Sequence, residues 1–203
     1  MTVSFILHDD PFVQYQAWFA EAEASEPAEA NAFTLATAAA DGRPAARMLL
    51  LKGLDPEGAP ERGFVFYTNL QSRKGDELRQ NPAAAMLFYW RSLGRQIRIE
   101  GRVQAASEAE ADAYFATRPR VSRLGAWASD QSRPLLTRAV LEGRLAEMES
   151  RFPGENIPRP PNWSGYRLVP ARFEFWQNMP YRLHDRTVFI AVSGGWTQGK
   201  LFP

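Results

Sequence analysis

The sequence predicts an α+β fold, in which helices pack outside an antiparallel β-sheet or barrel. Short apolar runs are separated by turn residues, such as the pairs Asp41-Gly42 and Gly194-Gly195, and this spacing is typical of antiparallel strands. The regular alternation of strand and helix that a parallel sheet needs is missing. The chain contains neither a GxGxxG fingerprint nor a Walker loop. A Rossmann domain and a P-loop domain are therefore not expected.

The first helix is expected to begin after Asp9 or Asp10. Either residue can cap a helix, and Pro11 suits its first turn. The stretch 21–31 is rich in Ala and Glu and is expected to end as a loop. Aromatic residues at helical spacing give the helix an apolar side, at Phe12, Tyr15, Trp18 and Phe19.

Strands are expected where apolar, β-branched and aromatic residues alternate or run together between turn signals. Two loops should interrupt them, one at 53–62 and one at 153–164, because both segments are rich in proline. The predicted strands cover residues 32–38, 45–52, 63–68, 84–90, 96–104, 166–169, 172–177, 187–192 and 196–201.

Four further helices are predicted. Ser107 and Glu110 form a capping box at the start of one of them, and Pro134 is expected to open the longest. The helices cover residues 72–80, 107–117, 122–129 and 134–151. The longest has a plausible core stripe made of Leu135, Val140, Leu141, Leu145 and Met148.

The bulk composition is that of an ordinary globular protein. Of the 203 residues, 45% are apolar and 23% are charged, which suits one compact domain over residues 1–203. Residues 1–31 would form its N-terminal helix and loop, and 165–203 its last strands. The net charge is +1 and the basic residues are dispersed, so no nucleic-acid partner is expected.

Several kinds of site are excluded by the residues that are missing. The chain has no cysteine, which excludes disulfides, zinc–thiolate sites and thiol nucleophiles. Its only histidines, His8 and His184, are too few for a three-histidine zinc site, and no metal is expected. The first residues do not resemble a signal peptide, and no apolar run approaches the roughly 18–20 residues that span a membrane. We expect a cytoplasmic protein with no membrane partner.

The start of the second predicted helix carries two cations, Arg73 and Lys74, behind the capping Ser72. A helix N-terminus has free N–H groups and a positive dipole end, so its first turn normally favours Asp or Glu. A bound phosphate would satisfy the N–H groups and both side chains together. The alternative is that both cations are solvated and balanced by Asp76 and Glu77.

Arg47 and Lys52 bracket an apolar run of one Met and three Leu. Such cations are most often two exposed strand ends, but they can also be two arms of one site at the rim of a sheet. Strict alternation places residues five apart on opposite faces. A ligand shared by Arg47 and Lys52 would therefore require a bend or bulge in this strand.

Tyr114, Arg118 and Ser122 are spaced four apart, as on one face of a helix. Pro119 is expected to interrupt that helix, so the spacing can be accidental. A guanidinium between two hydroxyls suits a phosphate. Spacing alone favours the other interpretation, in which Tyr114 packs and Arg118 is solvated.

The segment Arg182-Leu183-His184-Asp185-Arg186 is the densest group of polar side chains. If it is a strand, then Arg182, His184 and Arg186 share one face. That face would suit either an anionic ligand or a solvated edge. Asp185 would point the other way, so a Ser-His-Asp triad is not expected.

Taken together, these segments resemble the pyridoxine 5'-phosphate oxidase family in their order and spacing. The similarity runs from about Asp10 to Pro203. Its motifs are 47–52 (RMLLLK), 66–74 (FYTNLQSRK), Arg95-Gln96, 114–122 (YFATRPRVS), 125–127 (GAW), Gln131-Ser132, 174–176 (EFW) and 182–186 (RLHDR).

The resemblance implies a split β-barrel that forms a homodimer, with FMN at the subunit interface. It implies a bend in the strand at 47–52. It assigns the substrate phosphate to Lys52, Tyr114, Arg118 and Ser122, and it places Arg182 and His184, the implied catalytic residues, over the substrate ring. The FMN-binding residues that it implies are Arg47, Met48, Leu49, Leu50, Leu51, Lys52, Tyr67, Thr68, Arg73, Lys74, Gln96, Gln131, Ser132, Trp176 and Arg186.

The implied reaction is the oxidation of pyridoxine or pyridoxamine 5'-phosphate to pyridoxal 5'-phosphate. A hydride would pass from the C4′ carbon to the flavin, and O2 would then be reduced to hydrogen peroxide. In such an enzyme the cofactor performs the chemistry, while the protein orients the reactants and supplies the electrostatics. Two alternatives stay open. One is a related flavin oxidase of the phenazine type, and the other is a non-catalytic protein that binds FMN or pyridoxal phosphate.

Overall fold

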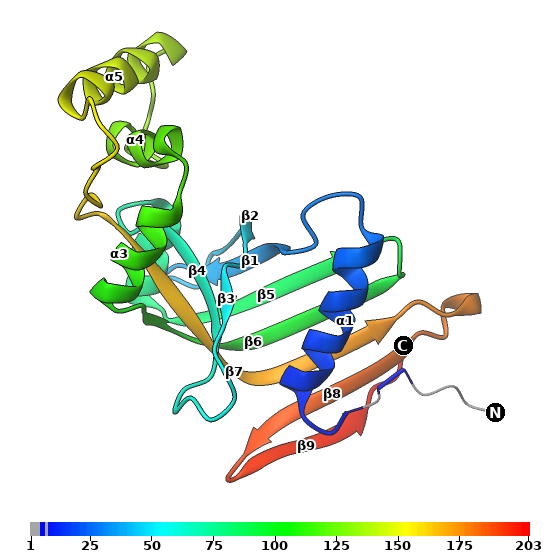
Figure 1. The fold of residues 1–203 in the computed structure, drawn as a ribbon. Helices are drawn as coiled ribbons and strands as arrows, with labels where there is room; N and C mark the ends of the chain where they lie inside the picture. The colour runs from blue at the N-terminus through cyan, green and yellow to red at the C-terminus, as the bar shows by residue number, and fades with distance from the viewer. Residues whose placement is uncertain (1–4, 7) are drawn as a thin grey trace.

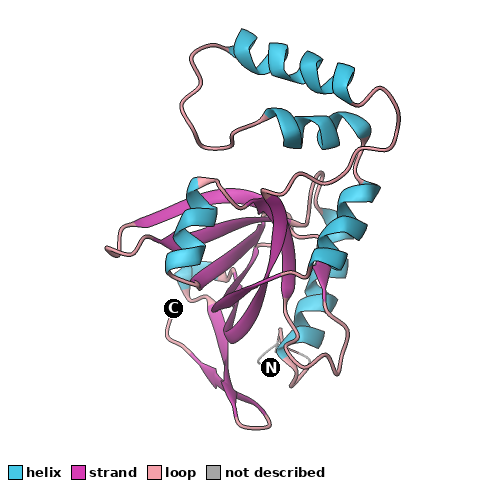
Figure 2. Cartoon of the chain, turned by 90° about the vertical axis from the view of Figure 1, so that its left-hand side faces the viewer, coloured by secondary structure: helices cyan, strands magenta, loops and turns pink. Residues whose placement is uncertain are grey.

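The computed structural model describes residues 5–6 and 8–203. A curled antiparallel sheet forms the body of the molecule, α1 lies across one of its faces, and α3, α4 and α5 stand beyond one end (Figure 1). Figure 2 shows α4 and α5 stacked above the sheet. The helices are α1 (Pro11–Ser25), α2 (Arg73–Gln80), α3 (Glu108–Thr117), α4 (Arg120–Ala128) and α5 (Arg138–Arg151). The strands are β1 (Ala32–Ala38), β2 (Pro44–Leu50), β3 (Gly53–Leu54), β4 (Phe64–Asn69), β5 (Ala83–Trp90), β6 (Arg95–Ala105), β7 (Trp163–Gln177), β8 (Asp185–Val192) and β9 (Gly195–Lys200).

Every strand pair in the sheet is antiparallel, which confirms the predicted fold class. The order is β2-β1-β5-β6-β7-β4-β3, and β8 with β9 extends from β7. The long strand β7 pairs with β6 along its length. Its first half also pairs with β4 and its second half with β8. The sheet therefore divides along β7, as a split barrel does.

A bulge in the middle of β7 changes which side chains face the core. Gly101 of β6 lies opposite Pro170, but Glu100 lies opposite Arg172, so Ala171 is an extra residue in β7. A Cβ on Gly101 would lie 2.0 Å from the carbonyl oxygen of Val169, so only glycine fits there. We predicted two strands here, 166–169 and 172–177. The structure has one continuous strand, because the bulge absorbs the Pro-Ala pair without ending the pairing.

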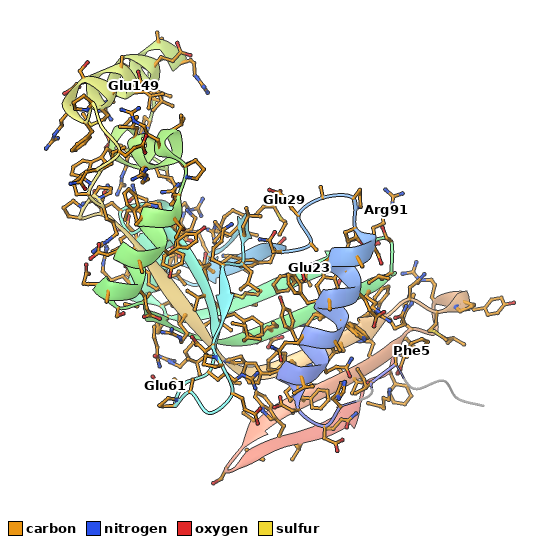
Figure 3. All side chains as sticks on the ribbon, in the orientation of Figure 1. Phe5, Glu23, Glu29, Glu61, Arg91 and Glu149 are labelled. Carbon is orange, nitrogen blue, oxygen red and sulfur yellow. The ribbon has the colours of Figure 1, made fainter. Side chains whose placement is uncertain are left out.

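The main core lies between α1 and the sheet, and its side chains fill the space between them (Figure 3). Phe12 and Tyr15 of α1 pack against Phe64 of β4, and Trp18 packs edge-on against Phe175 of β7. Asp10 caps α1 by accepting the N–H of Phe12. The predicted start of this helix is confirmed.

A second, smaller core joins α3, α4 and α5 to the start of β7. It contains Phe115, Leu124, Ala128, Met148, Ile157 and Trp163. The helix predicted at 107–117 and its capping box are confirmed. No helix within residues 5–6 and 8–203 is long and apolar enough to cross a membrane.

Some predicted boundaries were wrong. The helix α1 runs five residues into the stretch 21–31, because Ala22 is completely buried against the core, and the stretch then ends as a loop at 26–31, as predicted. Two residues of the predicted loop at 53–62 form β3. The last helix starts at Arg138 and not at Pro134. Its predicted core stripe is also wrong in part, because α5 packs mainly on α4. Leu135 and Val140 are exposed, Leu141 and Leu145 are half-buried, and only Met148 is buried.

Candidate functional site

A cavity of about 530 Å³ lies between the end of β2, β4 and the α3–α4 pair. It brings together residues that are distant in the sequence. Of the residues predicted to bind a ligand, it is lined by Leu49, Leu50, Lys52, Tyr67, Thr68, Tyr114, Arg118, Ser122 and Gln131. We call this cavity the first half-site.

Lys74 lies at the start of α2, behind the cap formed by Ser72. Its side chain is only 6% exposed, so the predicted alternative of a solvated lysine is wrong. The Nζ atom donates to Gln131 Oε1 at 2.8 Å and to Thr68 Oγ1 at 3.2 Å. Burial, together with the positive charge of Arg47, lowers the pKa of Lys74 to about 8. A cation held without a carboxylate partner in its first contacts is suited to receive an anion.

Arg47 and Arg73 do not line the cavity, and both point to the buried carboxylate of Glu77. Arg47 Nη2 lies 2.9 Å from Glu77 Oε2, and Arg73 Nε lies 2.8 Å from Oε1. Thr37 also donates to this carboxylate. Burial alone would raise the pKa of Glu77, but the hydrogen bonds from Thr37, Arg73 and Arg47 outweigh it and lower the pKa. Glu77 thus holds two arginines beside Lys74.

A stack of aromatic rings forms one wall of the first half-site. Tyr67 stacks on Tyr114 and on Trp163, at centroid distances of 4.2 Å and 5.4 Å, and the rings of Tyr114 and Trp163 lie 6.2 Å apart. The guanidinium of Arg118 lies 4.8 Å from the centre of the Trp163 ring. Its Nη1 atom is buried and has no hydrogen-bond partner among the described residues, and burial lowers the pKa of Arg118. An unpaired buried guanidinium is costly unless an anion joins it.

Proline interrupts the helix between Tyr114 and Ser122, as predicted. Arg118 ends α3, and Pro119 precedes the first residue of α4. The three predicted phosphate-binding residues nevertheless line the same cavity. The interpretation that spacing alone favoured was right that Tyr114 packs, because its ring stacks on Tyr67. It was wrong that Arg118 is solvated, because the guanidinium lies over Trp163 and its Nη1 atom is buried.

The bend implied for the 47–52 strand is present. The strand β2 ends at Leu50, and the backbone N–H of Lys52 then pairs with Val65 of β4 instead of with β1. Because the backbone leaves β1 at this point, Lys52 lines the cavity, whereas Arg47 points to Glu77 outside it. Met48 is 61% exposed and lies outside the cavity.

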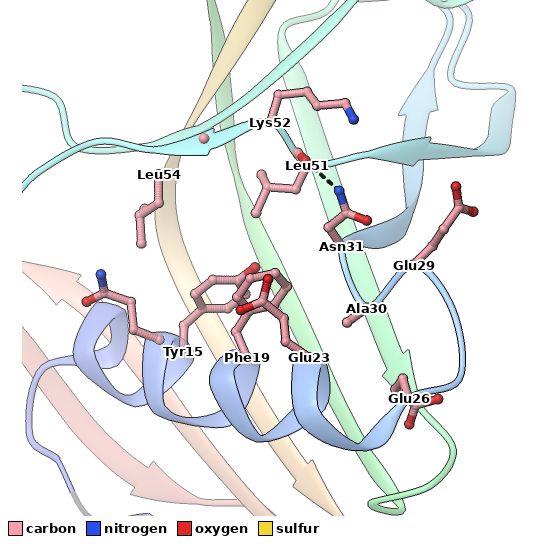
Figure 4. Close-up of a pocket in the computed structure, with 12 residues that line it drawn as sticks. Tyr15, Phe19, Glu23, Glu26, Glu29, Ala30, Asn31, Leu51, Lys52 and Leu54 are labelled. Carbon is pink, nitrogen blue, oxygen red and sulfur yellow. Dashed lines mark hydrogen bonds between the residues drawn. The ribbon is translucent and has the colours of Figure 1, made fainter.

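A separate cavity of about 560 Å³ lies between α1 and the segment that joins β2 to β3 (Figure 4). Lys52 and Leu51 border it. Its other walls include Glu23, Glu26 and Glu29, and this acidic lining does not suit a phosphate. Although it is slightly larger, this cavity does not hold the predicted site.

A second group of predicted residues gathers at the other end of β7, which we call the second half-site. Gln96 lies opposite Trp176, and Trp176 lies opposite Arg186. The rings of Trp176 and His184 are 4.5 Å apart. The Nδ1 atom of His184 accepts the backbone N–H of Met179 at 3.2 Å.

Residues 182–186, considered above as one strand, are a strand only at their end. Residues Pro180–Arg182 form a 3₁₀ turn, and β8 begins only at Asp185. Tyr181 and Arg182 have φ angles of 59° and 62°, a left-handed conformation that a strand cannot contain. This turn lets the exposed Arg182 lie beyond the end of the sheet.

The two half-sites are far apart in one chain. Tyr67 pairs with Gly165 at the start of β7, and Gln96 pairs with Trp176 near its end. Eleven residue steps along a strand span about 35 Å, and Figure 1 shows these ends of β7 on opposite sides of the molecule. One chain therefore does not assemble all the predicted residues.

Ser132, with a φ of 70°, borders a neighbouring cavity beside α5.

Three residues of the site were missed from the sequence. Trp163 closes the aromatic stack, but it lies in a segment predicted to be a loop. Glu77 holds Arg47 and Glu174 holds Arg186, but these partners lie 30 and 12 positions away in the sequence. The only signal was that Glu174 belongs to one of the motifs that carried the resemblance.

Comparison with known proteins agrees with this geometry. The family model described as pyridoxamine 5'-phosphate oxidase matches residues 19–152. The model described as the pyridoxine 5'-phosphate oxidase C-terminal dimerisation region matches residues 163–203.

Curated relatives match almost the whole chain. The pyridoxine/pyridoxamine 5'-phosphate oxidase of Sphingopyxis alaskensis is 59% identical, over 97% of this chain and 89% of its own. That of Gluconobacter oxydans is 58% identical, over 97% and 96%. A solved structure of PhzG from Burkholderia lata, in complex with tetrahydrophenazine-1-carboxylic acid, is 35% identical, with a TM-score of 0.88 over 97% of this chain and 94% of that one. The chain belongs to the pyridoxine/pyridoxamine 5'-phosphate oxidase family.

Proposed function

We propose that this protein is an FMN-dependent oxidase that converts pyridoxine or pyridoxamine 5'-phosphate to pyridoxal 5'-phosphate, with O2 as the electron acceptor and hydrogen peroxide as a product. The observation that carries the proposal is the first half-site. Its lining includes Lys52 and the half-buried Arg118, whose Nη1 atom is buried and unpaired among the described residues, and its Thr68 and Gln131 contact the buried Lys74. Both the cofactor and the substrate carry a phosphate. Lys74 beside the cavity and Arg118 within it offer a cationic group for each.

The residues around α2 fit the phosphate of FMN. Lys74 supplies the buried ammonium group, and Arg47 and Arg73 stand beside it on Glu77. The helix N-terminus adds its N–H groups and its dipole. Thr68 and Gln131 accept hydrogen bonds from Lys74 in the structure. They would contact the FMN phosphate from the side opposite α2.

The residues on the α3–α4 side fit the substrate phosphate. Arg118 has an unpaired, buried Nη1 atom, and Lys52, Tyr114 and Ser122 border the same cavity. A guanidinium fixed over Trp163 binds a phosphate by two parallel hydrogen bonds. The ring of the substrate would then lie between this phosphate and the flavin.

We propose that two copies of the chain complete each site. The second half-site lies within residues 163–203, the segment that matches the dimerisation region. Large apolar side chains are exposed around it, with Tyr181 at 92%, Leu183 at 68% and Phe202 at 95%. Apolar exposure of this kind favours burial in an interface. The second half-site of one copy would then meet the first half-site of its partner, as in a symmetric dimer.

FMN, when bound, supplies the hydride acceptor and passes the electrons to O2. The protein orients the substrate and holds charge near its C4′ carbon. His184 accepts a hydrogen bond at Nδ1, so the neutral ring carries its proton at Nε2. We propose that this N–H donates to the C4′ substituent, and that the Arg182 cation stabilises negative charge at the same atom.

A second candidate function is oxidation of a phenazine-type ring, which the similarity to the PhzG structure supports. Such a substrate has no phosphate to meet Arg118. The higher identity to the pyridoxine/pyridoxamine 5'-phosphate oxidases, 59% against 35%, favours the first proposal.

Aerobic turnover tests the proposal. The purified protein is loaded with FMN, supplied with pyridoxine 5'-phosphate, and followed for aldehyde and hydrogen peroxide together. Equal amounts of the two products are expected, and unphosphorylated pyridoxine should react far more slowly. If FMN binds but neither pyridoxine nor pyridoxamine 5'-phosphate is oxidised, the proposed function is wrong.

A further inference from the structure

The outer face of the sheet carries a row of charged side chains beside the second half-site. Strand alternation places Arg98, Arg172, Glu174 and Arg186 on the face that also carries Trp176, opposite the aromatic core. Glu174 is at the centre of this row, and only 2% of its surface is exposed. A buried carboxylate without paired cations would be strongly unfavourable, so its partners define what it does.

The two carboxylate oxygens of Glu174 serve different arginines. Oε2 accepts from Arg98 at 2.5 Å and from Arg172 at 3.3 Å. Within the described part of the chain, Oε1 accepts only from Arg186, whose Nε and Nη2 atoms lie 2.9 Å and 2.7 Å away. Glu100 pairs with Arg98 and Arg172 but has no contact with Arg186. One oxygen of the cluster is thus dedicated to Arg186.

Arg186 is fixed from a second side by the end of the chain. Its Nη1 atom donates to the carbonyl of Phe202 at 2.8 Å, and its own carbonyl accepts the N–H of Leu201. A guanidinium has five N–H donors, and these three bonds leave one N–H on each terminal nitrogen. The side chain is held in place while two donors stay available to a ligand.

We propose that Glu174 is a positioning residue for FMN binding, which acts by fixing the orientation of the Arg186 guanidinium. This inference rests on the proposed function, in which Arg186 binds the flavin. Without the carboxylate, Arg186 would keep its charge but lose the contact that aligns its two free N–H groups. Supporting contacts of this kind set how well a binding side chain is placed.

The test compares FMN affinity in four variants of the full-length protein, measured by quenching of flavin fluorescence. Glu174→Gln keeps the shape of the side chain but removes its charge, and we expect FMN to bind about tenfold or more weakly, as for loss of a charged hydrogen bond. Glu100→Gln is the matched control, because it removes a carboxylate from the same cluster without touching Arg186, and its affinity should stay within about twofold of wild type. Arg186→Ala and the double variant Glu174→Gln/Arg186→Ala complete a mutant cycle.

If Glu174 acts through Arg186, the substitution at Glu174 should weaken FMN binding in the wild type and have almost no further effect in Arg186→Ala. Equal losses in both backgrounds, or equal losses in Glu174→Gln and Glu100→Gln, would overturn the positioning role. Unchanged affinity in Arg186→Ala would instead contradict the proposed FMN site itself. If Glu174→Gln does not fold, Glu174→Asp keeps the charge but withdraws it from Arg186. Wild-type FMN affinity in a folded Glu174→Asp protein would also overturn the proposal.

Discussion

Raising the pH should weaken FMN binding through a single side chain, Lys74. In the free protein, burial and the neighbouring charge of Arg47 lower the pKa of Lys74 to about 8. The proposed FMN phosphate would favour the charged ammonium form and raise that pKa again. Binding would therefore take up a proton at pH values between about 8 and the raised pKa of the complex, and the affinity would fall as the pH rises through that range.

The size of the effect follows from the pKa. If only the ammonium form binds, the apparent Kd grows in proportion to 1 + 10^(pH − 8), which is about 1.1 at pH 7 and about 11 at pH 9. A tenfold loss of affinity between these values corresponds to about 1.4 kcal/mol. Because the phosphate becomes a dianion above about pH 6, binding should be tightest between about pH 6 and 8.

The assay is a titration of the FMN-free protein by flavin fluorescence at half-unit steps from pH 6.5 to 9.5. Lys74→Arg is the matched control, since a guanidinium stays charged over this range, and its profile should be flat. Riboflavin, which lacks the phosphate, should also show no dependence on Lys74. A flat profile for the wild type, or the same slope in Lys74→Arg, would refute the reasoning.

Three further predictions concern other parts of the structure. Arg118→Ala should raise KM for pyridoxine 5'-phosphate by about 10- to 100-fold, as for loss of a charged hydrogen bond, and should leave the Kd for FMN unchanged. An equal rise in this KM and in the Kd for FMN would place Arg118 at the cofactor instead. Co-expressed Arg118→Ala and His184→Ala chains should recover about a quarter of wild-type activity. Half of the randomly formed dimers contain one chain of each kind, and in these one of the two sites is built from intact half-sites. No recovery of activity would argue against sites shared between two chains. The pKa of Glu110 is lowered to about 2 by the backbone N–H of Ser107, by Arg167 and by the Ser107 hydroxyl. Its stabilising effect is therefore present above the unfolded pKa of about 4.3 and lost as the pH falls toward 2, so the Tm difference between wild type and Glu110→Gln should shrink over that range; a constant difference would contradict the assignment.

The local elements of the fold could be predicted because their signals lie within a few residues. Asp10 with Pro11, and Ser107 with Glu110, mark helix starts by hydrogen bonds that the chain makes to itself. The start of the last helix was placed wrongly at Pro134, although proline is a residue type common in the first turn of a helix. Residues 134–137 are exposed and pack on nothing that would favour a helix there.

The halves of the site could be predicted as motifs, but their separation could not. Whether Tyr67 and Trp176 meet depends on the strand pairing and on the length of β7, which are non-local properties. The burial of Lys74 had the same origin, because the residue that covers it, Gln131, lies 57 positions away. Local patterns showed Glu77 of α2 only as a balancing charge, since its partner Arg47 lies 30 positions away on β2.

The extra residue at Ala171 constrains how the gene for this protein can vary. Before it, even-numbered residues such as Tyr166 and Leu168 are buried, and after it the odd-numbered Phe173 and Phe175 are buried. Deleting one residue between Pro170 and Phe173 would turn the indole of Trp176 into the aromatic core and Phe175 out to solvent. Insertions and deletions within 163–177 should therefore be tolerated poorly, whereas length changes in the exposed hairpin turn at Gly194 should be harmless to both half-sites.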